Sequence, residues 1–162
     1  METRPKCILA LEQGLGKTCV SLVDAVAPIL VVCTAPMKFT WEREAGLFRP
    51  GLKVQVIRNK NDKIDKTADV HIINYDILGK IRVPRPKTLI VDECHKIKNY
   101  QSRRTKAVLT IAAGIERVRF LSGTPVPNRP IELFPVLEML GALGGLTWKT
   151  YGRRFCGGRD VN

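Results

Sequence analysis

Leu11-Glu-Gln-Gly-Leu-Gly-Lys-Thr18 is the stretch from which the rest of this chain can be interpreted. It follows a short apolar run, Cys7 to Leu11, that is typical of a strand. It leads into Thr18 to Ala27, which is typical of a helix and is stopped by Pro28. Glycines between a strand and a helix let the backbone curl until its N–H groups face one anion, and the helix start adds partial positive charge. The stretch therefore predicts a phosphate-binding loop.

The loop is expected to bind the phosphates of ATP through Gly14, Leu15, Gly16, Lys17 and Thr18. Lys17 is the candidate catalytic cation, which would reach the β- and γ-phosphates, and the Thr18 hydroxyl would bind Mg²⁺. ATP and Mg²⁺ are thus the expected cofactors. The full pattern has Gly at the first position, where this chain has Leu11. A glycine-rich turn with an incidental lysine is the alternative that this segment alone leaves open.

A second apolar run ends in two acids. Thr88 to Val91 is strand-like and continues into Asp92-Glu93. Beside a phosphate loop, an acid at such a strand tip holds Mg²⁺ and the next one can orient or activate the attacking water. Asp92 is therefore a predicted metal ligand and Glu93 a predicted catalytic residue. Acids at strand ends are often only solvated turn residues. Two motifs at strand ends of one parallel sheet would instead meet where such sheets bind ligands.

Strand-like and helix-like segments alternate along the chain. The strand-like runs are continuously apolar, which indicates burial on both faces of a sheet, and the alternation indicates parallel strands. Further strands are expected at Ile29–Thr34, Lys53–Ile57, Val70–Asn74 and Arg119–Leu121, and further helices at Lys38–Phe48, Ser102–Ala113 and Pro130–Leu140. Ser102 is the expected N-cap of its helix and Gly114 its stop. The predicted fold is a three-layer α/β sandwich with a mainly parallel sheet.

The charge balance is strongly basic. Lys and Arg number 27 against 15 Asp and Glu, which gives a net charge of +12. Such an excess favours a polyanionic partner such as nucleic acid, although solubility alone is the simpler explanation. The cations recur in short clusters at Lys80-Arg82-Arg85-Lys87, Lys96-Lys98, Arg103-Arg104-Lys106 and Arg153-Arg154.

The five cysteines are odd in number and have no CxxC spacing, which argues against a disulfide framework or a zinc site. Their pattern favours a reducing, intracellular location, either cytoplasmic or DNA-associated. No apolar run is long enough to span a bilayer, and the N-terminus lacks a signal-peptide layout. No membrane partner is expected.

Taken in order, these segments resemble the first lobe of superfamily-two helicases, and within them the Swi/Snf-like translocases. The resemblance covers about residues 7 to 156. Motifs I, Ia, II of the DExH kind, and III are matched by Leu11–Thr18, Cys33–Lys38 with Trp41–Glu44, Asp92–Asn99 and Leu121–Pro125. Ile72–Leu78, Asn128–Phe134 and Tyr151–Cys156 resemble further family segments, the last of them from the annealing-helicase-like branch. The resemblance implies a RecA-like P-loop fold, with residues 1–162 as one N-terminal ATP-binding lobe and the second lobe absent.

The family also implies roles for residues other than the phosphate-binding loop and the two strand-end acids. Coupling of the nucleotide site to the nucleic-acid track would use His95, Ser122, Gly123 and Thr124. Positions near the DNA backbone would be Pro36, Lys38, Asn74 and Tyr75. Plainer interpretations stay open, in which Tyr75 caps the core, Lys38 is solvated and Trp41 is a packing residue.

The implied function is the ATP-binding lobe of a DNA-dependent ATPase or translocase that acts on double-stranded DNA. Efficient hydrolysis would need a second lobe, with its arginine finger, from another chain or a full-length helicase. The alternative is a non-motor module that binds nucleic acid or regulates a helicase while retaining a nucleotide site. A P-loop kinase or GTPase fits less well, because no acceptor-specific residues follow the loop.

Overall fold

One parallel sheet organises the chain. The computed structural model describes residues 5–126 and 128–157. Their strands are β1 (Lys6–Leu9), β2 (Ile29–Cys33), β3 (Val54–Val56), β4 (Val70–Asn74), β5 (Thr88–Asp92) and β6 (Arg117–Leu121). They lie in the order β1-β6-β5-β2-β4-β3, and each neighbouring pair is parallel. This order places the ends of β1, β6 and β5 side by side, so the segments that follow these three strands meet at one edge.

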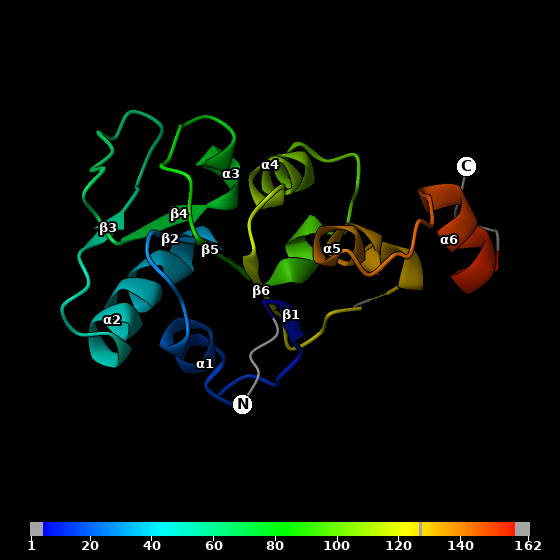
Figure 1. Ribbon diagram of the computed structural model, residues 1–162, viewed down its shortest axis with the longest axis horizontal. Coiled ribbons are helices and arrows are strands. Elements are labelled where there is room, and N and C mark those ends of the chain that lie inside the picture. The colour runs from blue at the N-terminus through cyan, green and yellow to red at the C-terminus, as the bar shows by residue number, and fades with distance from the viewer. Residues whose placement is uncertain (1–4, 127, 158–162) are drawn as a thin grey trace.

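Helices cover both faces of the sheet (Figure 1). On one face lie α1 (Lys17–Val23) and α2 (Lys38–Phe48), and on the other α3 (Tyr75–Leu78), α4 (Arg103–Ala112) and α5 (Phe134–Leu140). Short 3₁₀ turns are η1 (Ala35–Met37), η2 (Cys94–Ile97) and η3 (Pro130–Leu133), and α6 (Trp148–Phe155) ends the described chain. The predicted three-layer α/β sandwich is confirmed.

The strands explain why both faces need helices. Along β2, Leu30 and Val32 pack toward α3 and α4, while Ile29, Val31 and Cys33 pack toward α1 and α2. Successive side chains of a strand point to opposite faces, so a fully apolar strand must be covered twice. Every residue of β2, β4 and β5 is buried accordingly.

The C-terminal part differs from the sequence prediction in two ways. The single helix expected over Pro130–Leu140 is divided into η3 and α5, because Pro135 has no N–H to donate and so stands in the first turn of a new helix. The helix α6 was not predicted. A capping box between Thr147 and Thr150 starts it, and Tyr151 packs edge-on against Phe134 with ring centroids 5.4 Å apart.

The predicted cap of α4 is present. The Ser102 Oγ accepts a hydrogen bond from the Thr105 N–H at 3.2 Å. Ser102→Ala is expected to lower the free energy of unfolding by about 1 kcal/mol, because this N–H loses its acceptor at the helix start. Urea unfolding followed by circular dichroism measures the change. Ser102→Gly is the matched control, with an expected loss of only a few tenths of a kcal/mol. Equal losses in both variants would contradict the capping explanation.

Candidate nucleotide site and nucleic-acid interface

The phosphate loop joins β1 to α1. Gly14 and Gly16 have φ of 83° and 72°, a backbone region that side chains disfavour. The Lys17 ammonium lies within the loop and donates to the carbonyls of Leu11 at 2.9 Å and Glu12 at 2.8 Å. Phosphate oxygens are stronger acceptors than these carbonyls, and the same ammonium could donate to them instead. The first position of the loop does not need glycine here, because Leu11 has no positive φ. Among the described non-glycine residues, only Glu93 has one.

Asp92 ends β5 and is almost fully buried, with 7% of its surface exposed. Its Oδ2 accepts from the Trp41 indole Nε1 at 2.9 Å, and its Oδ1 accepts from the Glu93 N–H at 3.0 Å. Burial raises the pKa of this carboxyl above its ordinary value, while the Trp41 hydrogen bond and the positive charge of Lys17 oppose the rise. The parallel pairing of β1 with β6 and of β6 with β5 brings the loop that follows β1 and the acid that ends β5 to the same edge of the sheet.

Glu93 and His95 link this edge to the turn after β6. Glu93 has φ of 51°, and its Oε2 lies 3.2 Å from the His95 Nδ1. The same Nδ1 lies 3.2 Å from the Ser122 Oγ, which also accepts from the Thr124 N–H at 3.1 Å. The predicted catalytic acid and three of the predicted coupling residues therefore form one hydrogen-bonded group.

Gly123, the fourth predicted coupling residue, lies against the phosphate loop. A Cβ at this position would stand 3.6 Å from the Leu11 carbonyl oxygen and within 4 Å of Glu12 and Gln13. The turn after β6 thus lies against the backbone of the loop whose carbonyls accept hydrogen bonds from Lys17. The neighbouring β1 and β6 bring the two segments together.

The four residues predicted to lie near DNA differ in their exposure to solvent. Pro36 is exposed in η1. Lys38, Asn74 and Tyr75 are buried, with 6%, 7% and 5% of their surfaces exposed. The Lys38 ammonium donates to the carbonyls of Ile57 and Arg58, at 3.0 and 3.3 Å, and to the Asn74 Oδ1 at 3.3 Å.

These contacts bear on the plainer interpretations. The idea that Lys38 is a solvated helix residue is wrong, because the ammonium is satisfied by internal acceptors. Tyr75 does pack in the core, and its hydroxyl also donates to the Asp92 carbonyl at 2.5 Å. Roles for these side chains at the DNA backbone stay predictions.

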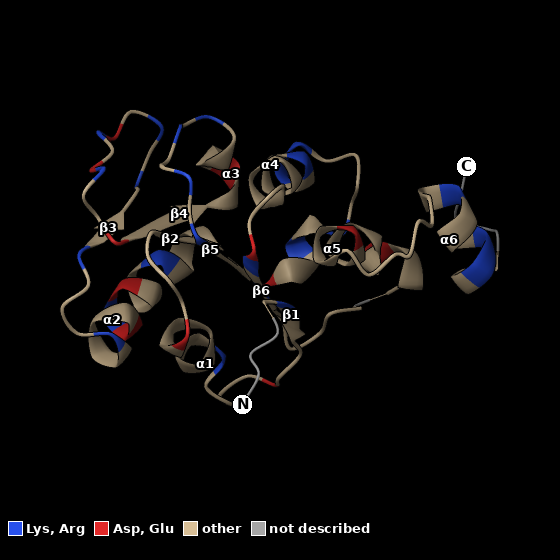
Figure 2. Ribbon diagram, viewed as in Figure 1, with Lys and Arg blue, Asp and Glu red and all other residues tan. Residues whose placement is uncertain are grey.

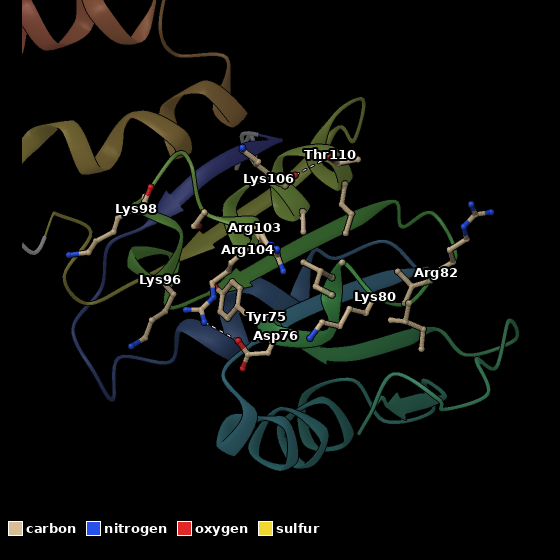
Figure 3. A pocket seen from close by; sticks show the side chains of 18 of the residues that line it. Tyr75, Asp76, Lys80, Arg82, Lys96, Lys98, Arg103, Arg104, Lys106 and Thr110 are labelled. Atoms are coloured by element: carbon tan, nitrogen blue, oxygen red, sulfur yellow. Dashed lines mark hydrogen bonds and ion pairs between the residues drawn. The ribbon is translucent and has the colours of Figure 1, made fainter. Parts of the chain in front are cut away.

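A broad groove of about 1400 Å³ opens between α3, the segment after it, η2 and α4 (Figure 3). This basic groove is lined by the cations Lys80, Arg82, Lys96, Lys98, Arg103, Arg104 and Lys106, and its lining contains the single acid Asp76. Figure 2 shows basic positions on α4 and on the loop that follows α3. Three of the clusters seen in the sequence therefore converge here, although the sequence alone gave no sign that they would.

Arg104 connects the basic groove to the strand-end acid. Its guanidinium pairs with Asp76 at 2.9 Å and stands over the Tyr75 ring, 5.5 Å from the ring centroid. The Tyr75 hydroxyl in turn donates a hydrogen bond to the Asp92 backbone carbonyl. Arg85, from the same basic cluster as Lys80, instead donates to the Ala113 and Gly114 carbonyls at the end of α4.

Across the described ranges, no helix combines the length and the apolar character that crossing a membrane requires.

Comparison with known proteins agrees with this geometry. A family described as the SNF2-related domain matches residues 1–155. The SWI/SNF-related matrix-associated actin-dependent regulator of chromatin subfamily A-like protein 1 of Bos taurus is 30% identical over 167 residues, covering 96% of this chain and 18% of that protein. The DNA annealing helicase and endonuclease ZRANB3 of Bos taurus is 31% identical over 169 residues, covering 93% of this chain and 16% of that protein. The chain thus spans less than a fifth of the length of these two relatives.

A solved structure shares the architecture. The Sulfolobus solfataricus SWI2/SNF2 ATPase core in complex with dsDNA superimposes with a TM-score of 0.80 at 26% identity, over 94% of this chain and 35% of that one. Because the family match extends over nearly the whole chain, this protein belongs to the SNF2-related domain family.

Proposed function

We propose that this chain is the N-terminal, ATP-binding RecA-like lobe of a DNA-dependent ATPase of the Swi/Snf-like type, and that a second lobe must complete its site for efficient hydrolysis. The observation that carries the proposal is that the loop with Lys17, Asp92 and the Glu93–His95–Ser122 group lie at one sheet edge. Two relatives whose names specify chromatin regulation or DNA annealing add support for DNA as the partner. An intracellular, DNA-associated location follows from the same proposal.

The residues present fit a magnesium nucleotide. The loop offers an ammonium that donates to two backbone carbonyls, and Gly14 and Gly16 have the positive φ that a curled phosphate loop uses. Thr18 in the first turn of α1 and Asp92 supply the hydroxyl and carboxylate oxygens that Mg²⁺ prefers. Bound Mg²⁺ would neutralise charge on the phosphates during transfer.

The chain's own residues would have separate roles in hydrolysis. Lys17 would hold the terminal phosphates, and Glu93 would orient an attacking water and accept its proton. The His95 Nδ1 contacts both Glu93 and Ser122, so a shift of the turn after β6 would change the position of Glu93. The DExH identity of this motif belongs to the proposal.

ATP hydrolysis by the purified chain, with and without double-stranded DNA, tests the proposal, with Lys17→Ala as the comparison. Slow turnover that DNA stimulates, that Lys17→Ala abolishes and that a supplied second lobe increases supports it. DNA binding that survives Lys17→Ala, with no turnover even when a second lobe is supplied, would instead assign a non-motor binding module.

The basic groove is the DNA surface that the charge pattern favours most. Lys and Arg that neutralise phosphates release counterions, so the logarithm of the affinity falls linearly with the logarithm of the salt concentration, by about 0.9 for each phosphate contacted. Replacing both Arg103 and Lys106 by Ala is expected to reduce this slope by about 2, because both exposed side chains line the groove.

Fluorescence anisotropy of labelled double-stranded DNA across a salt series measures the slope. The control is the double replacement of Lys60 and Lys63 by Ala, which removes the same charge from an exposed loop after β3, outside the groove. Equal slope changes in the two double variants would show that net charge, and not the groove, binds DNA.

A further inference from the structure

Trp41 is almost completely buried, and its side chain makes a polar contact with the acid that ends β5. It lies on α2, one turn after Lys38, and has 1% of its surface exposed. Its indole Nε1 donates to the Asp92 Oδ2 at 2.9 Å, across 51 positions of sequence. A buried indole N–H needs an acceptor, and here the acceptor is the acid that ends β5. The packing role predicted for this tryptophan is therefore only part of what it does.

Three elements fix Asp92 from three directions. Trp41 on α2 donates to Oδ2, the Glu93 N–H in the following turn donates to Oδ1, and the Tyr75 hydroxyl on α3 donates to the backbone carbonyl. A carboxylate has about four acceptor positions on its two oxygens, so each oxygen keeps capacity for a further ligand. The side chain is thus oriented without being saturated.

The indole N–H is a donor only, so it occupies one lone pair of Oδ2. Together with the Glu93 N–H on Oδ1, it fixes the direction in which the remaining lone pairs of the carboxylate point. A metal ion binds through these lone pairs, so a partner that orients the carboxylate matters for metal binding.

We propose that Trp41 is a positioning residue for Mg²⁺, whose indole N–H holds the Asp92 carboxylate in the orientation that the metal requires. The inference rests on the proposed function, because it concerns the metal that accompanies the nucleotide. It assigns to α2 a part in the nucleotide site, in addition to its place in the core.

Trp148 provides a matched control for Trp41. The chain has two tryptophans, and Trp148 lies in the C-terminal aromatic cluster, stacked on Tyr100 with ring centroids 5.7 Å apart. Replacing either tryptophan by Phe removes an indole N–H and keeps an aromatic ring. Only the change at Trp41 removes a donor to Asp92.

The test measures binding of a fluorescent ATP analogue with and without Mg²⁺, by anisotropy, in the unaltered chain and in Trp41→Phe and Trp148→Phe. Loss of a partner that orients a metal ligand typically weakens metal binding 10- to 100-fold. The factor by which Mg²⁺ strengthens nucleotide binding should therefore fall about 10-fold or more in Trp41→Phe, with Mg²⁺-free binding unchanged. Trp148→Phe should retain the full factor.

An unchanged Mg²⁺ factor in Trp41→Phe, or equal weakening with and without the metal, would overturn the inference and leave Trp41 a packing residue. Nucleotide binding by the unaltered chain that Mg²⁺ does not strengthen would refute the proposed function itself, and the inference with it.

A second measurement covers the case in which Trp41→Phe does not fold. In the Trp148→Phe chain, Trp41 is the sole indole, so its emission reports on its bond to Asp92. Adding Mg²⁺ to the ATP-bound protein should change this emission, and the change should vanish when Asp92→Ala is added. Emission that is indifferent to Mg²⁺ would contradict the proposal.

Discussion

Supplying a second RecA-like lobe should raise the ATP turnover of this chain by about 10³- to 10⁵-fold, the effect that an arginine finger has on phosphoryl transfer. This corresponds to about 4 to 7 kcal/mol of activation free energy. The described chain brings together the predicted phosphate loop, the strand-end acids and the turn after β6, but an opposing cation is expected from the second lobe. This chain covers 35% of the Sulfolobus solfataricus SWI2/SNF2 ATPase core.

The measurement compares the purified chain with a fusion to the remaining part of a SWI2/SNF2 ATPase core, in the presence of double-stranded DNA. Lys17→Ala in the fusion is the control, because it should remove turnover that depends on this lobe's own loop. Motor-level turnover by the unfused chain, independent of its concentration, would show that no second lobe is needed.

In the completed enzyme, Glu93→Gln should lower turnover by about 10²- to 10⁴-fold, the usual contribution of a general base, and leave nucleotide affinity nearly unchanged. Glutamine keeps the shape of the side chain and an oxygen that can face His95, but cannot take a proton from water. The left-handed backbone at Glu93, with φ of 51°, turns this residue out of the line of β5 and toward His95. The loss should therefore appear in the chemical step alone.

Steady-state turnover and the affinity for a fluorescent ATP analogue, measured on the same variant, separate the two effects. Glu42→Gln is the matched control, since it makes the same chemical change at an exposed position of α2. Turnover in Glu93→Gln equal to that of this control would remove Glu93 from the mechanism and favour a module that only binds.

Much of the fold could be predicted from sequence because its signals are local. The bounds of α2 and β4 agree with the predicted Lys38–Phe48 and Val70–Asn74, and Ser102 caps α4 as expected. Continuous apolar runs can be stable only in a sheet covered on both faces, so they indicate the layers. The phosphate loop lies within one strand–turn–helix unit, and its residues needed no distant partner to be found.

The predictions were wrong or incomplete where distant segments meet. The alternative in which Lys38 is solvated is wrong, because two carbonyls just after β3 and the Asn74 side chain accept from its ammonium. The helix α6 follows a glycine-rich stretch, and its packing depends on Phe134 of another helix. Its Thr147–Thr150 cap was the local signal that could have revealed it.

The sequence by itself determined the layered parallel sheet, the loop that can hold phosphates and the two acids beside it, because periodicity, glycine and strand-end acids act over a few residues. Only the tertiary structure decided that Trp41 holds Asp92, that His95 joins Glu93 to Ser122, and that three basic clusters share one groove. The physical reason is the strand order β1-β6-β5-β2-β4-β3, which departs from chain order and places side by side the ends of segments far apart in sequence.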